Sequence, residues 1–161
     1  MSPTGARRRW ARGCLALLAL GEGLPGAWAL LRPRHFYDSY PLPGHPWVAG
    51  FPPYNEHLVR DFGAAVLALS VVLAWAACTA GPHLLRAAAV AALTLCVPHL
   101  AFHSAHLGRP FGVEEGAQVV SLAMPVGCAV IAFLAAGGPA PDTATEPQHD
   151  SRPPRKEDTP G

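Results

Sequence analysis

Residues 62–80, FGAAVLALSVVLAWAACTA, contain no charged side chain. A helix that rises 1.5 Å per residue needs about 20 apolar residues to cross a hydrocarbon core about 30 Å thick. Within lipid the backbone must satisfy its own hydrogen bonds, and an α-helix does so within a single segment. This stretch therefore predicts a transmembrane helix.

Three further stretches of the 161-residue chain have similar length and composition, and only one of them carries a formal charge, on Glu22. They are residues 13–31, 87–107 and 117–137. Together the four stretches predict an all-α fold, a four-helix up-down transmembrane bundle. The membrane domain would comprise residues 1–137, with an outer loop at residues 32–57.

The first stretch has an alternative interpretation as a signal peptide. Arginines at 7–9 would form its charged region, LALLAL its apolar region, and residues 27–29, Ala-Trp-Ala, its cleavage site. Against this, Glu22, Gly23 and Pro25 interrupt the apolar region, and the stretch is long enough to span a membrane. We therefore expect an uncleaved first helix and keep cleavage as the alternative.

The distribution of basic residues predicts the orientation of the bundle. Eight of the twelve lysines and arginines would be cytoplasmic if the N-terminus were, at positions 7, 8, 9, 12, 86, 152, 155 and 156. The positive-inside rule then places both termini in the cytoplasm. Residues 138–161 lack apolar periodicity and are rich in Pro, Asp, Glu and Thr, which predicts a disordered cytoplasmic tail. Because topology explains the basic cluster at 7–12, no nucleic-acid partner is expected.

Small residues recur along the four stretches and predict close approach of the helices, as is typical of membrane bundles. Those expected at helix contacts are Gly63, Ala64, Ala68, Ala87, Ala91, Gly127 and Ala132. The loop at 32–57 is rich in proline and aromatic residues, which favour the bilayer interface. We expect it to lie on the lipid headgroups, and a lid over the outer end of the bundle is the alternative.

Polar side chains gather in the outer half of the predicted bundle. His99, His103 and His106 follow one another at i, i+4 and i+7, so they form one stripe along a helix. Six residues complete or flank this candidate pocket: His57, Asp61, Gln118, Glu22, Glu114 and Ser121. Depth in the membrane favours pairing of Glu22 with His99 and of Asp61 with His103, because a charge facing lipid is costly. The residues predicted to line the pocket are Glu22, His57, Asp61, His99, His103, His106 and Gln118.

Three roles remain open for this pocket. The first is a hydrogen-bonded network that holds the helices together and binds a small ligand or a partner. The second is a transition-metal or haem site of a membrane oxidoreductase, with ligands among His99, His103, His106, His57 and Asp61. The third is a proton path, which is disfavoured because the polar groups stop at mid-membrane. Whether the protein is an enzyme stays undecided, with a non-enzymatic role favoured.

The segments RPRHFYDSYP, PPYNEHLVRDFGA and VPHLAFHSAHL resemble those of small bacterial integral membrane proteins with four helices and a broadly DoxX-like layout. The resemblance covers roughly residues 13–137. It implies a multi-pass protein of the bacterial plasma membrane with no assigned activity, an accessory or redox-associated role, and a membrane-protein partner or self-association.

Overall fold

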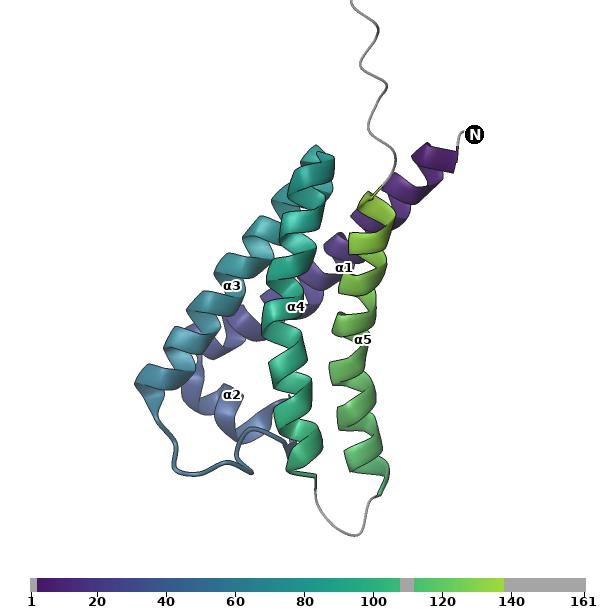
Figure 1. Cartoon of the computed structure of the whole chain (residues 1–161). Helices are drawn as coiled ribbons and strands as arrows, with labels where there is room; N and C mark the ends of the chain where they lie inside the picture. The colour runs from purple at the N-terminus through teal and green to yellow at the C-terminus, as the bar shows by residue number, and fades with distance from the viewer. Residues whose placement is uncertain (1–2, 108–111, 138–161) are drawn as a thin grey trace, which may run out of the picture.

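The computed structural model describes residues 3–107 and 112–137, and the fold in this part of the chain is helical (Figure 1). The helices are α1 (Pro3–Leu31), α2 (Pro33–Ser39), α3 (Glu56–Thr79), α4 (Pro82–Ala105) and α5 (Val113–Ala136). The prediction of an all-α fold with four long apolar helices is confirmed. The predicted tail, residues 138–161, lies outside the described residues.

Four of the helices are long and apolar enough to cross a membrane: Gly5–Leu31, Glu56–Thr79, Pro82–Ala105 and Val113–Ala136. Only 17–33% of each apolar window is buried within the protein, so most of its side chains face outward. Trp75 and Val71 of α3 and Leu20 of α1 are among these outward-facing groups. A surface this apolar suits lipid, and the chain is accordingly a multi-pass membrane protein by length and composition.

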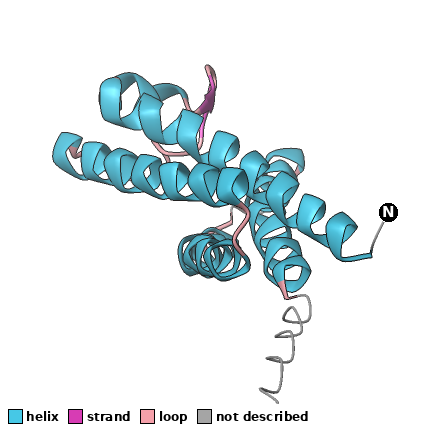
Figure 2. Ribbon diagram, turned by 90° about the horizontal axis from the view of Figure 1, so that it is seen from above, coloured by secondary structure: helices cyan, strands magenta, loops and turns pink. Residues whose placement is uncertain are grey.

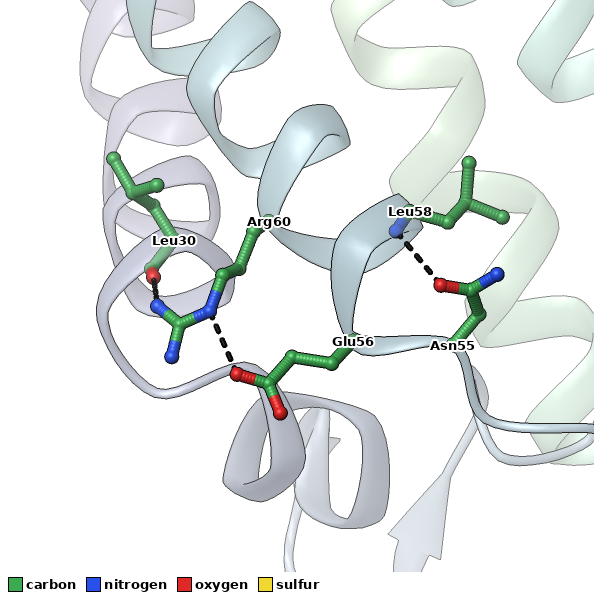
Figure 3. Close-up of polar contacts among 5 residues, drawn as sticks. All are labelled: Leu30, Asn55, Glu56, Leu58 and Arg60. Carbon is green, nitrogen blue, oxygen red and sulfur yellow. Dashed lines mark hydrogen bonds and ion pairs between the residues drawn. The ribbon is translucent and has the colours of Figure 1, made fainter.

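Each long helix begins before the apolar run that predicted it, because charged residues precede the run within the same helix. In α3 the difference is six residues, since the helix begins at Glu56 and the apolar run begins at Phe62. The Asn55 side chain caps this helix by accepting a hydrogen bond from the Leu58 backbone N–H at 3.1 Å (Figure 3). The apolar runs therefore mark the membrane-facing part of each helix and not its full length.

The segment expected to be a loop, residues 32–57, contains regular structure. It holds α2 and a pair of short antiparallel strands, β1 (Pro41–Leu42) and β2 (His45–Pro46). Gly44 has φ +88°, and with Pro43 before it the sequence fits a type II turn, which requires a positive φ at this position. Figure 2 shows the strands as a small feature at one edge of the helical molecule.

The helices are packed most tightly at one end, which we call the turn end because it contains the α3–α4 turn at residues 79–82. Figure 1 shows α3 and α4 side by side there and diverging toward the opposite, loop end, which carries residues 32–55. The buried core lies in the turn half: Ala11, Leu15, Leu18, Ala19, Leu73, Ala76, Ala77, Leu85, Ala88, Ala89, Ala92, Ala129, Ala132 and Ala136. By contrast, none of the residues 97–105 of α4 or 113–128 of α5 is fully buried.

Two arginines of α1 cap the carbonyl end of α3 at the turn end. Arg12 Nε donates a hydrogen bond to the Ala77 carbonyl at 2.7 Å, and Arg8 Nε donates one to the Ala80 carbonyl at 2.9 Å. The last carbonyls of a helix lack intrahelical partners and carry partial negative charge, so cationic donors stabilise them.

At the loop end, α1 and α3 meet through two glycines, Gly26 and Gly63. A Cβ added at Gly63 would lie 2.5 Å from the Leu30 backbone nitrogen and 2.8 Å from the Gly26 carbonyl oxygen. Backbone therefore packs directly against backbone at this crossing, as the small-residue rule for membrane helices predicts.

Candidate functional site

His99, His103 and His106 lie at the loop end of α4, and the first two are in direct contact. The imidazoles of His99 and His103 are stacked, with their ring centroids 4.8 Å apart and their planes inclined by 25°. Residues four apart on a helix share a face, which is why the sequence spacing predicted this neighbourhood. His106 lies one turn further on, where its ring stacks on Phe102 at 4.2 Å.

Gln118 of α5 lies beside this group. Its Nε2 lies 3.2 Å from His103 Nδ1, so a hydrogen bond links α4 to α5. If the amide donates to Nδ1, the proton of a neutral His103 ring is on Nε2, which can then act as a donor. We call His99, His103, His106 and Gln118 the histidine cluster.

The loop covers the histidine cluster through Phe51. The Phe51 ring lies edge-on to His103, with centroids 5.4 Å apart and planes at 90°, and it also contacts His106 at 6.2 Å. The loop is tied to α5 as well, through a contact between His45 Nδ1 and Glu114 Oε1. The sequence did not predict the His45–Glu114 pair, since the two side chains are 69 residues apart and no local spacing signals such a contact.

Glu22 of α1 faces α4, but its partner is Cys96 and not the predicted His99. Cys96 Sγ donates to Glu22 Oε1 at 3.7 Å, one turn of α4 closer to the turn end than His99. Burial, and to a lesser extent the Glu22 carboxylate, raise the pKa of the Tyr40 phenol at the end of α2 above its ordinary value. Glu22 therefore extends the polar region along α4 toward the turn end.

His57 and Asp61 form a pair of their own. His57 Nε2 lies 3.3 Å from Asp61 Oδ2, and the two side chains are 86% and 64% exposed. In the described part of the chain neither makes a hydrogen bond, ion pair or ring contact with the α4 histidines. The expected Asp61–His103 pairing is thus replaced by an i, i+4 pair. Since α3 begins at Glu56, Asp61 is only about 8 Å from the helix start and can reach the interface without facing inward.

The predicted metal ligands do not converge. Within residues 3–107 and 112–137, no group of three or more His, Cys, Asp or Glu side chains is placed to hold a metal ion. Structural zinc sites use four protein ligands and catalytic ones three. The metal hypothesis therefore depends on the stacked pair His99 and His103 alone.

A second polar region lies where α1 ends and α3 begins (Figure 3). Arg60 Nη1 donates to the Leu30 carbonyl at 2.6 Å, and Arg60 Nε donates to Glu56 Oε1 at 2.9 Å. The i, i+4 spacing of Glu56 and Arg60 signals their ion pair, but the contact with α1 depends on the tertiary fold. This junction fixes the end of α1 against the first turns of α3.

No protein-family model matches the chain, and neither the curated proteins nor the solved structures give a significant match.

Proposed function

We propose that this protein is a non-enzymatic, multi-pass protein of the bacterial plasma membrane whose histidine cluster joins the helices at the loop end and binds a small ligand. The fold supports the membrane setting, since four helices are long and apolar enough to span it. The resemblance to small four-helix membrane proteins of broadly DoxX-like layout implies the same setting. In this proposal the loop end faces outward, in accordance with the positive-inside rule.

The observation that carries the ligand proposal is the unfulfilled hydrogen-bonding capacity of His99. Its ring is partly buried and contacts His103 and Phe62, yet in the described residues it makes no hydrogen bond. Six residues separate it from the end of α4, a depth of about 9 Å. A buried polar group without a hydrogen-bond partner costs free energy. Binding of a ligand that supplies a hydrogen-bond partner for His99 would therefore be favoured.

The surroundings of the cluster indicate the chemical class of that ligand. Imidazole and amide groups offer hydrogen-bond donors and acceptors, whereas Phe51, Phe62 and Phe102 supply aromatic contact area. Binding sites for small molecules commonly combine a few polar groups with an aromatic lining. We infer a ligand with a carbonyl or hydroxyl group on an aromatic or alkyl body, which would enter from the membrane or from the outer surface.

The alternative is a metal- or haem-dependent oxidoreductase that uses His99 and His103. Two imidazoles one turn apart on a helix can share a metal ion, and the remaining ligands would then come from outside the described residues or from a bound molecule. Metal analysis separates this alternative from the proposal, because a structural and ligand-binding cluster requires no metal.

The experiment uses the full chain purified in a mild detergent, with elemental analysis, an absorption spectrum and native mass spectrometry. We expect protein without stoichiometric metal or a Soret band, and a bound small molecule that is lost in His99→Ala and His103→Ala. His83→Ala is the matched control, because His83 is an exposed histidine of the same helix at the turn end. Stoichiometric metal or a Soret band that disappears in the two cluster variants would establish the alternative. Protein without any bound molecule, also after incubation with a lipid extract, would contradict the ligand proposal.

A further inference from the structure

A groove of about 310 Å³ lies at the junction of α1, α2 and α3, apart from the histidine cluster. Its walls are formed by Arg32, Pro33, Arg34, His35, Tyr54, Glu56 and Arg60. Three of these seven residues are arginines and one is a histidine, whereas only one is acidic. With the histidine neutral, the lining carries a net charge of +2, three arginines less one glutamate. Asp38, which pairs with Arg34 from outside the lining, reduces the local balance to +1.

The groove contains cationic and neutral donors that the protein does not use. In the described residues the Arg32 guanidinium has neither a hydrogen bond nor an ion pair. Arg60 uses Nε and Nη1 for Glu56 and Leu30, which leaves Nη2 without a partner among the residues that the structure describes. These groups differ from Arg34, whose Nε donates to Asp38 Oδ2 at 2.7 Å.

His35 and Tyr54 add two further donors to the lining. The Trp28 indole N–H donates to His35 Nδ1 at 3.0 Å, so the proton of the neutral His35 ring is on Nε2, which makes no hydrogen bond in the described residues. The Tyr54 hydroxyl is buried and lacks a hydrogen-bond partner among the described residues. The Arg34 guanidinium lies 5.0 Å from the Tyr54 ring centroid. Because the Arg34 side chain is 67% exposed, it can move to admit an acceptor.

The groove lies at the ends of two candidate membrane spans. One candidate span ends at Leu31, the residue before Arg32, and the next begins at Glu56, so the lining residues lie at the ends of two spans. Tyrosine and tryptophan favour this depth, and phospholipid phosphates are found there. A phosphate oxygen accepts paired hydrogen bonds from the planar guanidinium, which makes arginine the usual residue for phosphate recognition.

We propose that this groove binds a phosphate group, supplied either by the headgroup of an anionic phospholipid or by a free phosphate. Arg32 is the principal ligand, because its guanidinium has no partner within residues 3–107 and 112–137, and Arg60 Nη2 and His35 Nε2 complete the donor set. Glu56 does not oppose binding strongly, since Arg60 Nε already holds its carboxylate. The groove shares no lining residue with the histidine cluster, so the failure of one proposal would not affect the other.

The test is isothermal titration calorimetry of the full chain in a neutral detergent with three probes: inorganic phosphate, dihexanoyl phosphatidylglycerol and dihexanoyl phosphatidylcholine. We expect saturable binding that weakens about tenfold or more in Arg32→Gln, because a charge-assisted hydrogen bond is lost. Arg32→Lys retains the charge and should lose less. Arg7→Gln is the matched control, an exposed arginine at the other end of α1. Elution as a single peak on size-exclusion chromatography verifies that each variant is folded.

The probes distinguish the two sources of phosphate. Arg32-dependent binding of phosphatidylglycerol without binding of inorganic phosphate identifies a lipid headgroup, and the reverse identifies a free phosphate. Arg32-dependent binding of both supports the site for either source. Binding of phosphatidylcholine as tight as that of phosphatidylglycerol would overturn the anionic phospholipid as the source, because the net charge of the lipid would then contribute nothing to binding. The proposal is overturned if no probe binds saturably, or if folded Arg32→Gln and Arg7→Gln bind as the wild type does.

Discussion

The two halves of the bundle use the same four helices for different purposes. In the turn half, alanine and leucine side chains of all four long helices form a continuous buried core, and arginines cap the end of α3. In the loop half, α1 and α3 remain in backbone contact at Gly26 and Gly63, whereas α4 and α5 have no fully buried residue over 97–105 and 113–128. Polar groups and a covering loop occupy this second half.

This difference suggests a division between stability and binding. Membrane helices associate through close packing, because lipid is as apolar as their side chains, so the alanine-rich half should provide most of the stability. The histidine cluster and the groove at Arg32 are both at the less densely packed end. Substitutions matched in type but placed in the two halves can test this division.

The largest expected effect belongs to Leu73→Ala in the turn half. Leu73 of α3 is fully buried in the core, and its truncation leaves a cavity that membrane helices cannot readily close. We expect the free energy of unfolding to fall by about 3 kcal/mol, measured by titration with sodium dodecyl sulfate in mixed micelles. Leu134→Ala is the control in the same half, because its side chain is 61% exposed and should change stability by less than about 0.5 kcal/mol. Equal losses in the two variants would contradict a packed core at this end.

Gly63→Ala should have the next largest effect, at the α1–α3 crossing of the loop half. The added methyl group would lie 2.5 Å from the Leu30 backbone nitrogen, so the two helices must separate. We expect a loss of about 2 kcal/mol in the same titration. Gly127→Ala is the matched control, since a Cβ at Gly127 meets nothing within 4 Å, and it should not destabilise the protein. A stable Gly63→Ala would mean that the crossing does not hold the loop half together.

The sequence predicted the helices well because an apolar run of membrane length has few other structures open to it. It predicted the contact faces less well. Gly63 and Ala132 are buried as expected, but the other five are exposed: Ala64, Ala68, Ala87, Ala91 and Gly127. Small size alone does not reveal which side of an all-apolar helix faces a neighbour and which faces lipid.

Only part of the polar site was predicted, and the reason is similar. Spacing along one helix identified the stripe at His99 and His103, and similar depth identified Gln118 as a neighbour. The depth of a residue along its helix does not specify how the helix is rotated about its own axis. Glu22 therefore contacts Cys96 instead of the expected His99, and Asp61 contacts His57. The contact of Phe51 with the cluster depends on the course of a loop that no periodicity describes.

Arg12→Gln should have a smaller effect, at the turn end. It removes the charged donor to the Ala77 carbonyl, although a glutamine can in part replace the hydrogen bond. We expect the free energy of unfolding to fall by about 1 kcal/mol, because a helix end loses a cationic partner. Arg7→Gln, which changes an exposed arginine of the same helix, serves as the control. If Arg12→Gln is as stable as the control, water satisfies the Ala77 carbonyl equally well.

Gln118→Leu should have the smallest effect on stability and thereby provides the sharpest test of the division. The substitution removes the hydrogen bond to His103 but retains the apolar bulk on α5, and hydrogen bonds between membrane helices contribute about 0.6 kcal/mol on average. We expect a loss of that order in the detergent titration, together with a clear loss of the small molecule proposed to bind the histidine cluster. Ser121→Ala is the control, because in the described part of the chain the Ser121 hydroxyl donates only to the Gln118 carbonyl of its own helix. A loss of several kcal/mol in Gln118→Leu with ligand binding unchanged would contradict the assignment of stability to the turn half and binding to the loop half. The polar loop half would then hold the bundle together.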